Sequence, residues 1–464
     1  MTPHRIEKDS LGKIQVPHSA LFGAQTQRAI ENYCISQRTA HPALLRAYLR
    51  IKWAAAITNG HLKVIDPKIS QLIQKAVQKI LKMPENEWPL HFPVDPYQAG
   101  AGTSQNMNMN EVVANVANQL AGLPLGSYQK VHPNDHVNRS QSTNDTFPTA
   151  MRLALLEVSE DLVSALRKAS EVLRKKAQSW EKLPKAARTH LQDAVPITLG
   201  QEFLAYSFTL KKCADWIELG RDALRDLGMG GSAAGTGLTV PRGYTQRIVK
   251  ELEKLTHESL YSSENLIEAM QSQAPILFYS SMLKICAVEM TRLCNDLRLL
   301  ASGPLTGLSE LRLPAVQPGS SIMPGKVNPS ILEMANQTWY SVLGYDQTVT
   351  YCTQAGQLEL NVMMPMMAYS LLEASSVATQ ATHTLTERCL KGLEPHIAQL
   401  HRYFEATPQV ATALNPKLGY EQVSSLVQES LAKGVSVLDL VREKKLLTEK
   451  ELRALLNIQS LTGL

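Results

Sequence analysis

The sequence predicts a mainly α-helical protein built around a long helical bundle. Five long segments repeat apolar residues at three- and four-residue spacing, as amphipathic helices do; they are 151–180, 201–225, 269–301, 329–350 and 361–392. The third segment is apolar on more than one side and, at about 1.5 Å per residue, would be roughly 50 Å long. A helix that is apolar on two sides needs cover on both, so we expect the bundles of several copies to pack together.

The regions on either side of these segments follow a different pattern. Short extended stretches near the start of the chain give way to helical patterns at 42–59 and 67–81, and beyond residue 394 the amphipathic segments become shorter. We therefore expect a mixed N-terminal domain (1–140), a central helical bundle domain (141–393) and a small helical C-terminal domain (394–464).

Composition excludes several classes of protein. The 464 residues are 44% hydrophobic and 19% charged, and 47 basic against 42 acidic residues give a net charge of +5. No block of five basic residues exists, which disfavours nucleic-acid binding. The six cysteines lack C-x-x-C spacing, so we expect buried free thiols and no metal site. No signal peptide and no run of eighteen apolar residues occurs, so we expect a soluble, cytoplasmic protein.

The most informative segment is Gly319-Ser-Ser-Ile-Met-Pro-Gly-Lys-Val-Asn-Pro329. Its glycines and prolines predict a loop, with Asn328 capping a helix that begins at Pro329. Two hydroxyls, an ammonium and a carboxamide suit the binding and deprotonation of a small anion. A polar surface loop is the alternative interpretation.

Three further segments are rich in polar side chains: Gly100–Glu111, His132–Asp145 and Arg188–Asp193. In Gly100–Glu111, small residues lead into a predicted helix, where Thr103, Ser104 and Asn106 can donate to a carboxylate, although a capped helix start is an alternative. In His132–Asp145, the consecutive Ser142, Thr143 and Asn144 form a neutral donor cluster.

Two histidine patterns and a glycine-rich pattern have competing interpretations. His132 and His136 are four residues apart, but Pro133 should break the helix that a metal pair would need. His190, in Arg188-Thr-His-Leu-Gln-Asp193, is a possible acid/base or orienting group. Gly228-Met-Gly-Gly-Ser-Ala233 fits a loose dinucleotide pattern, which we reject because a helix and no strand is expected before it.

Together these segments resemble the fumarase/aspartase superfamily, the family of class II fumarases and aspartate ammonia-lyases. The resemblance rests on the 319–329 segment and extends from Ile6–Gly12 and Gly23–Thr26 to Leu446–Leu452. It implies an L-aspartase-like fold with a central five-helix bundle. It also implies a homotetramer with active sites shared by three subunits, and a small dicarboxylate as the substrate.

The resemblance implies roles for particular residues. Ser320 matches the family's catalytic base, which removes a proton next to a carboxylate and gives an aci-carboxylate; His190, paired with Glu333, would help position the substrate or handle the leaving-group proton. No cofactor and no metal is expected. The residues expected to bind the substrate are Thr103, Ser104, Ser142, Thr143, Asn144, Thr189, Ser321, Lys326 and Asn328.

The residues found in several short motifs favour ammonia over water as the leaving group, so we expect an aspartate ammonia-lyase. A class II fumarase is the alternative, favoured by Gly23–Gln27, Met107–Met109 and Val131–Pro133. The segments that lean toward aspartase are Phe92–Asp95, Ala101–Ser104, Ser142–Asp145, Asp193–Pro196, Asn265–Ala269 and Ala355–Gln357. Departures from both patterns, at Ala187, Thr239, Leu305 and Met364, leave open a weakly active or non-catalytic paralogue.

Overall fold

A computed structural model of the chain describes residues 3–463, apart from the side chains of residues 459 and 460. The chain forms two compact units, each assembled from three stretches of sequence. Unit 1 contains the residues up to Val163 together with Asp215–Ile285 and Ser341–Ala378. Unit 2 contains Ser164–Ala214, Cys286–Tyr340 and the residues from Thr379 onward. The division into three domains at residues 140 and 393 stays a prediction.

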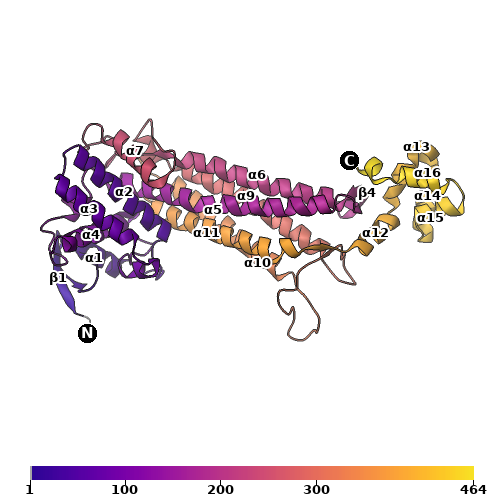
Figure 1. Ribbon diagram of the computed structural model, residues 1–464, viewed down its shortest axis with the longest axis horizontal. Coiled ribbons are helices and arrows are strands. Elements are labelled where there is room, and N and C mark those ends of the chain that lie inside the picture. Colours follow the sequence, from indigo (N-terminus) through magenta and orange to yellow (C-terminus); the bar gives the residue numbers. More distant parts are fainter. Residues whose placement is uncertain (1–2, 464) are drawn as a thin grey trace. The chain divides into compact units, whose positions relative to one another are not determined.

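Five helices of 25 to 37 residues dominate the described residues, which confirms the mainly helical fold (Figure 1). Each begins within eight residues of the start of the segment that predicted it; the largest difference is at the first helix, which begins at Thr143 and not at residue 151. The third predicted segment is interrupted at Ser272 and Gln273, between α8 (Glu268–Gln271) and α9. The five are α5 (Thr143–Ser179), α6 (Leu199–Leu224), α9 (Ala274–Leu300), α10 (Ser330–Gln354) and α11 (Met364–Arg388).

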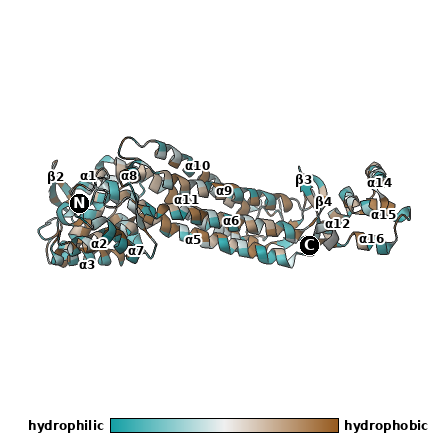
Figure 2. Ribbon diagram, turned by 90° about the horizontal axis from the view of Figure 1, so that it is seen from above, coloured by the Kyte–Doolittle hydropathy of each residue, from teal (hydrophilic) through white to brown (hydrophobic). Residues whose placement is uncertain are grey.

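Side-chain hydrogen bonds and ion pairs join these helices within each unit. In unit 1, the Tyr279 hydroxyl of α9 lies 2.9 Å from Ser375 Oγ of α11. Lys284 Nζ of α9 lies 2.7 Å from Asp346 Oδ2 of α10. Hydrophobic residues recur along the same helices in Figure 2. The pairs in unit 2 are Ser170–Ser207 (α5–α6), Tyr206–Asp296 (α6–α9), Asn295–Asn336 (α9–α10) and Lys168–Glu387 (α5–α11). The predicted bundle is therefore held by polar contacts as well as by apolar packing.

Unit 1 also contains the mixed structure that the start of the sequence predicts. Strands β1 (His4–Asp9) and β2 (Gly12–Pro17) pair in antiparallel fashion. Helix α3 (Pro67–Leu81) has the predicted bounds, because Asp66 caps it and Pro67 opens its first turn. The remaining helices and strands of this unit are α1 (Ala24–Asn32), α2 (Pro42–His61), α4 (Thr103–Leu120), β5 (Asp226–Leu227), α7 (Tyr244–Thr256) and β6 (Tyr261–Ser262).

Unit 2 contains a hairpin that the sequence did not predict. Strands β3 (Pro184–Thr189) and β4 (Gln192–Thr198) pair in antiparallel fashion between α5 and α6. Beyond α11, short helices enclose a separate apolar core that includes Val410, Leu426 and Leu440. The other elements of this unit are β7 (Leu311–Arg312), β8 (Glu394–Pro395), α12 (Ile397–Ala406), α13 (Asn415–Leu418), α14 (Tyr420–Lys433), α15 (Val437–Glu443), α16 (Glu449–Leu455) and α17 (Ile458–Thr462).

Among residues 3–463, none of the helices combines the length and the apolar character that a membrane-spanning helix needs.

Candidate active site

The polar segments Gly100–Glu111 and His132–Asp145 meet in unit 1, where α4 and α5 begin. Thr103 is exposed at the first position of α4, and Ser104 beside it is half-buried. Gly102 precedes them with φ of 85°, and a Cβ atom there would lie 1.9 Å from the ring of Phe147 on α5. Glycine is therefore required at this position, since it lets the start of α4 pass directly against α5.

The two histidines of the second segment cap a turn. Pro133 opens a short π-helical turn, Pro133–Val137, and His132 lies outside it as the capping residue, so the two histidines do not share one helix, as the proline predicted. The Nδ1 atom of His132 accepts hydrogen bonds from the backbone N–H groups of Asn134 and Asp135, and His136 Nδ1 accepts one from the N–H of His132. These contacts give both rings a structural role.

The donor cluster Ser142–Asn144 lies at the start of α5. Thr143 is buried, and its Oγ1 accepts a hydrogen bond of 3.0 Å from Asn106 Nδ2 on α4. Asn144 is half-buried, and its Nδ2 donates to the carbonyl oxygen of Ala233 at 2.7 Å. The structure thus brings Thr143 and Asn106 together within one chain.

Asp145 fixes the backbone of this cluster. Its carboxylate is buried and accepts hydrogen bonds from the N–H groups of Ser142, Gly230 and Ser232 at 2.9 to 3.1 Å. Burial raises the pKa of Asp145 to about 6, while these backbone donors act in the opposite direction. The carboxylate therefore ties the start of α5 to the glycine-rich segment.

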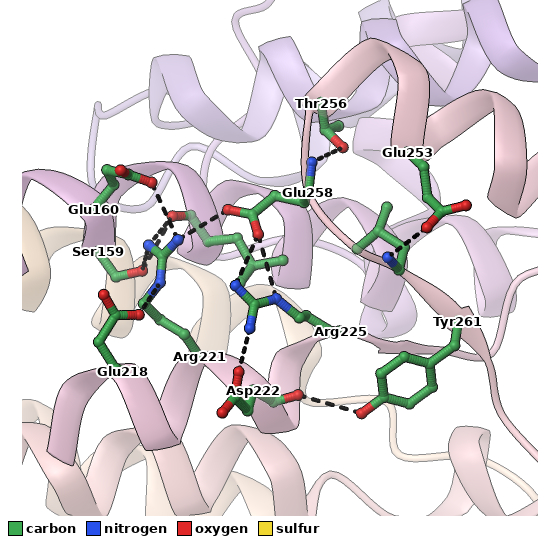
Figure 3. Close-up of polar contacts among 12 residues, drawn as sticks. Ser159, Glu160, Glu218, Arg221, Asp222, Arg225, Glu253, Thr256, Glu258 and Tyr261 are labelled. Atoms are coloured by element: carbon green, nitrogen blue, oxygen red, sulfur yellow. Dashed lines mark hydrogen bonds and ion pairs between the residues drawn. The ribbon is translucent and has the colours of Figure 1, made fainter. Parts of the chain in front are cut away.

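That glycine-rich segment has its own anchor at the end of α6. The two-residue strand β5 precedes Gly228, so the expectation of a helix there was wrong, and the next helix begins only at Tyr244. Figure 3 shows Arg221, near the end of α6, and Arg225, directly after that helix, both pointing at Glu258; their Nη2 atoms lie 2.9 and 3.1 Å from its carboxylate oxygens. Arg221 is buried and also donates to Ser159 Oγ on α5. This cluster holds the chain where it enters the segment that binds Asp145.

Sequence reasoning missed Lys52, on α2. Its side chain is completely buried, and its ammonium group donates to three amide oxygens, those of Asn106, Asn138 and Gln141, at 2.8 to 3.2 Å. Burial lowers the pKa of Lys52 to about 7, and the charge of Asp145 acts in the opposite direction. The sequence signal that could have found it is its position: Lys52 lies on the same helical face as the buried Tyr48 and Ala56, where an apolar residue would be expected.

The polar segment Arg188–Asp193 forms the tip of the β3–β4 hairpin in unit 2. Thr189 and His190 are exposed, and His190 and Leu191 have positive φ angles of 55° and 58°, as the central residues of a two-residue hairpin turn do. Within residues 3–463 of one chain, no hydrogen bond or ion pair joins His190 to Glu333. The predicted pairing of these two residues therefore stays a prediction.

The 319–329 segment is a loop whose two ends are joined by hydrogen bonds. Gly319 N–H donates to the carbonyl oxygen of Lys326, and Asn328 Nδ2 donates to the carbonyl oxygen of Gly319, at 2.8 and 2.7 Å. Helix α10 begins at Ser330, one residue later than predicted, and Asn328 closes the loop where a helix cap was expected. Ser321 and Lys326 are exposed, whereas Ser320 is half-buried.

Two cavities adjoin this loop within unit 2. One, of about 480 Å³, is lined by residues 315–320 and 323–327. The other, of about 920 Å³, has Lys326, Arg298, Arg312 and His396 in its wall, with Glu333 as its acidic residue. A wall with this excess of basic groups suits an anionic ligand.

The four departures from the family's spelling have different environments. Leu305 is 94% exposed, whereas Met364 is completely buried at the start of α11. Ala187 lies at an irregularity in the pairing of β3 with β4. Thr239 has φ of 72°, a backbone conformation that is unfavourable for a β-branched residue.

Comparisons with known proteins agree with the resemblance. A family model described as Lyase matches residues 12–344, and one described as Fumarase C C-terminus matches residues 410–463. The chain is 43% identical to an aspartate ammonia-lyase of Bacillus subtilis over 459 residues, covering 99% of this chain and 96% of the relative. It is 39% identical to a class II fumarate hydratase of Thermosynechococcus vestitus over 463 residues, covering 100% and 98%.

A solved structure agrees as well. The fumarate lyase:delta crystallin of Brucella melitensis, in a crystal structure described as bound to cobalt, superposes with a TM-score of 0.95 at 41% identity and covers 98% of this chain and 99% of that one. The chain therefore belongs to the lyase family of the fumarase/aspartase superfamily.

Proposed function

We propose that this protein is an aspartate ammonia-lyase, a carbon–nitrogen lyase that converts L-aspartate reversibly into fumarate and ammonia. Curated aspartate ammonia-lyases are 40 to 43% identical to nearly the whole chain, which supports the assignment. The observation that carries the chemistry is the environment of Ser320. A cytoplasmic location stays a prediction.

Ser320 is the proposed catalytic base, and its surroundings favour a negatively charged oxygen. Its Oγ accepts hydrogen bonds from the backbone N–H groups of Ile322 and Met323, at 3.2 and 3.0 Å. Hydrogen bonds to a charged group favour that form, so these two donors help a serine act as a base. The sequence alone offered no such explanation.

The proposed reaction proceeds in two steps. The Ser320 alkoxide takes a proton from the carbon next to one carboxylate, and the electron pair left behind forms an aci-carboxylate with two negative charges. That electron pair then forms the double bond of fumarate as the carbon–nitrogen bond breaks and the amine leaves. The positive charge of Lys326 and the donors Thr103, Ser142 and Thr143 would stabilise the doubly charged intermediate.

Asn144 favours an amine as the leaving group. Its Nδ2 already donates to the carbonyl oxygen of Ala233, which can only accept, so its Oδ1 is left as an acceptor. The ammonium group of L-aspartate has three donor hydrogens and a positive charge, and it suits such an oxygen better than the hydroxyl of L-malate does. A class II fumarase is the second candidate, because a fumarate hydratase is also similar over the full chain.

The complete site would require several copies of the chain. The polar residues at the starts of α4 and α5 belong to unit 1, whereas the hairpin and the loop belong to unit 2. We propose a homotetramer in which three subunits contribute to each site, with His190 of one copy facing Glu333 of another. Thr189, Ser104, Ser321 and Asn328 would complete the binding of the dicarboxylate.

The first experiment is to follow fumarate by its ultraviolet absorbance with purified protein, given L-aspartate or L-malate in parallel. Turnover of aspartate with little turnover of malate is expected, and the reverse result would identify a fumarase. Turnover of neither would point to another substrate or to a non-catalytic paralogue. In the same assay Ser320→Ala should abolish activity without changing the assembly, and substantial residual turnover would remove Ser320 from the role of base.

A further inference from the structure

A completely buried lysine lies behind one of the proposed substrate-binding residues. Lys52 is 0% exposed, and its Nζ lies 2.8 Å from Asn106 Oδ1, 3.0 Å from Gln141 Oε1 and 3.2 Å from Asn138 Oδ1. All three partners are neutral amides. An ammonium group has three donors and no acceptor, so each of these amides must turn its oxygen toward Lys52.

The orientation of Asn106 determines what its other end can do. With Oδ1 held by Lys52, its amide nitrogen faces Thr143 and donates to Thr143 Oγ1 at 3.0 Å. The hydroxyl of Thr143 therefore acts as an acceptor on this side. Among the residues that the structure describes, no protein group accepts the Thr143 hydroxyl hydrogen, so that hydrogen is available to a ligand.

The backbone around Thr143 is held in place from another direction. The buried Asp145 carboxylate accepts the N–H groups of Ser142, Gly230 and Ser232. Thr143 thus has a fixed backbone on one side and a directed hydrogen-bond chain on the other. Both arrangements lie within unit 1 and consist of buried groups that a mainly apolar interior would not need.

We propose that Lys52 is a positioning residue for the dicarboxylate site: it directs the hydrogen-bond chain Lys52–Asn106–Thr143 so that the Thr143 hydroxyl donates to a carboxylate of the ligand. This inference rests on the proposed function, because it takes Thr143 to be a substrate-binding residue. Lys52 itself does not touch the substrate.

The test is a double-mutant cycle read by succinate binding. Succinate is a dicarboxylate without a leaving group, so calorimetry measures binding independently of turnover. Lys52→Met and Thr143→Val should each raise the Kd for succinate by about 10-fold, the size expected for one hydrogen bond to a charged group. If Lys52 acts through Thr143, the double variant should also bind about 10-fold more weakly, and not about 100-fold.

Several outcomes would overturn the inference. An unchanged Kd in Lys52→Met, or additive effects in the double variant, would show that Lys52 does not act through Thr143. The exposed Lys68→Met on α3 is the matched control and should leave the Kd unchanged. If unaltered protein neither bound succinate nor turned over L-aspartate, the proposed function would fail as well, whereas failure of the positioning role alone leaves both intact.

A second variant covers the case in which Lys52→Met does not fold. Asn106→Asp keeps an oxygen for Lys52 but has no N–H to donate, so the Thr143 hydroxyl would turn toward the new carboxylate. Succinate binding should weaken more in this variant than the same change causes in a Thr143→Val background. Equal weakening in both backgrounds would reflect only the added negative charge and would overturn the inference.

Discussion

Two buried lysines, one in each unit, are stabilised in opposite ways. Lys52 in unit 1 is 0% exposed and donates to three neutral amides. The Lys185 side chain in unit 2 is 1% exposed and pairs with the carboxylates of Glu202 and Glu310, at 2.7 and 2.8 Å. Glu310 also pairs with Arg188 at 2.6 Å.

The difference teaches what each lysine is suited to do. A lysine neutralised by carboxylates forms a fixed crosslink, here one that holds the hairpin carrying Thr189 and His190. A lysine surrounded by amides has no direct counter-ion, and in its protonated form it imposes a direction on every hydrogen bond around it. The first arrangement supports the position of a loop, and the second determines which groups remain free to donate.

The largest expected effect comes from removing the ion-paired lysine. Lys185→Met leaves the buried Glu310 and the half-buried Glu202 without their shared partner, so the free energy of unfolding should fall by about 3–5 kcal/mol. Lys52→Met leaves only neutral oxygens without a donor and should cost about 1–3 kcal/mol. Urea denaturation measures both, with the exposed Lys175→Met as a control that should change little. Equal losses at the two sites would contradict the comparison.

A third lysine, the exposed Lys326, should affect catalysis without such a loss of stability. Lys326→Ala removes a charge from the proposed site, so kcat/KM for L-aspartate should fall by about 100-fold, with KM and kcat both affected. Steady-state kinetics measures the loss, and Lys68→Ala serves as the control. If kcat/KM changed by less than a few-fold, Lys326 would not contact the reacting dicarboxylate.

The amide-bound lysine should also make stability depend on pH. Its pKa is about 7 in the folded protein against about 10.5 in the unfolded chain. Between these values only the unfolded chain holds the proton, so the free energy of unfolding should rise with pH, by at most about 1.4 kcal/mol per pH unit. Below about pH 7 both the folded protein and the unfolded chain hold the proton, so the titration of Lys52 no longer makes the free energy of unfolding depend on pH.

Comparison with Lys52→Met isolates that contribution between pH 7.5 and 9.5. Two titratable groups face Lys52: burial raises the pKa of Asp145 only to about 6, and burial raises that of Tyr48 well above 10, so neither titrates in this window. In Lys52→Met, the free energy of unfolding measured by urea denaturation should rise less over this pH range than in the unaltered protein. Parallel pH profiles would mean that Lys52 keeps its proton throughout.

The smallest expected effect concerns the loop that binds Asp145. Thr239 has a positive φ, where asparagine is tolerated better than a β-branched residue. Thr239→Asn should therefore raise the free energy of unfolding by about 1 kcal/mol. Thermal or urea unfolding measures the change, with Thr236→Asn as a control at a threonine without positive φ. A destabilised Thr239→Asn variant would rule out backbone strain at this position.

Much of the architecture could be predicted because it depends on local patterns. Apolar spacing predicted the long helices and the bounds of α3, which Asp66 caps in the structure. The glycine- and proline-rich segment was correctly predicted as a loop. The contact between Asn106 and Thr143 was not predicted, because it joins the starts of two separate helices. The β3–β4 hairpin was missed, because short strands depend on pairing with each other and on the buried Lys185–Glu310 contact.

The sequence by itself determined the helical class, the polar loop and the family, since helix periodicity and motif spelling are properties of neighbouring residues. Only the tertiary structure decided that Lys52 is buried, that Asp145 binds the glycine-rich segment, and that Ser320 accepts two backbone donors. The physical reason is that burial and hydrogen-bond direction depend on which distant groups are brought together, and no local pattern in the chain records that.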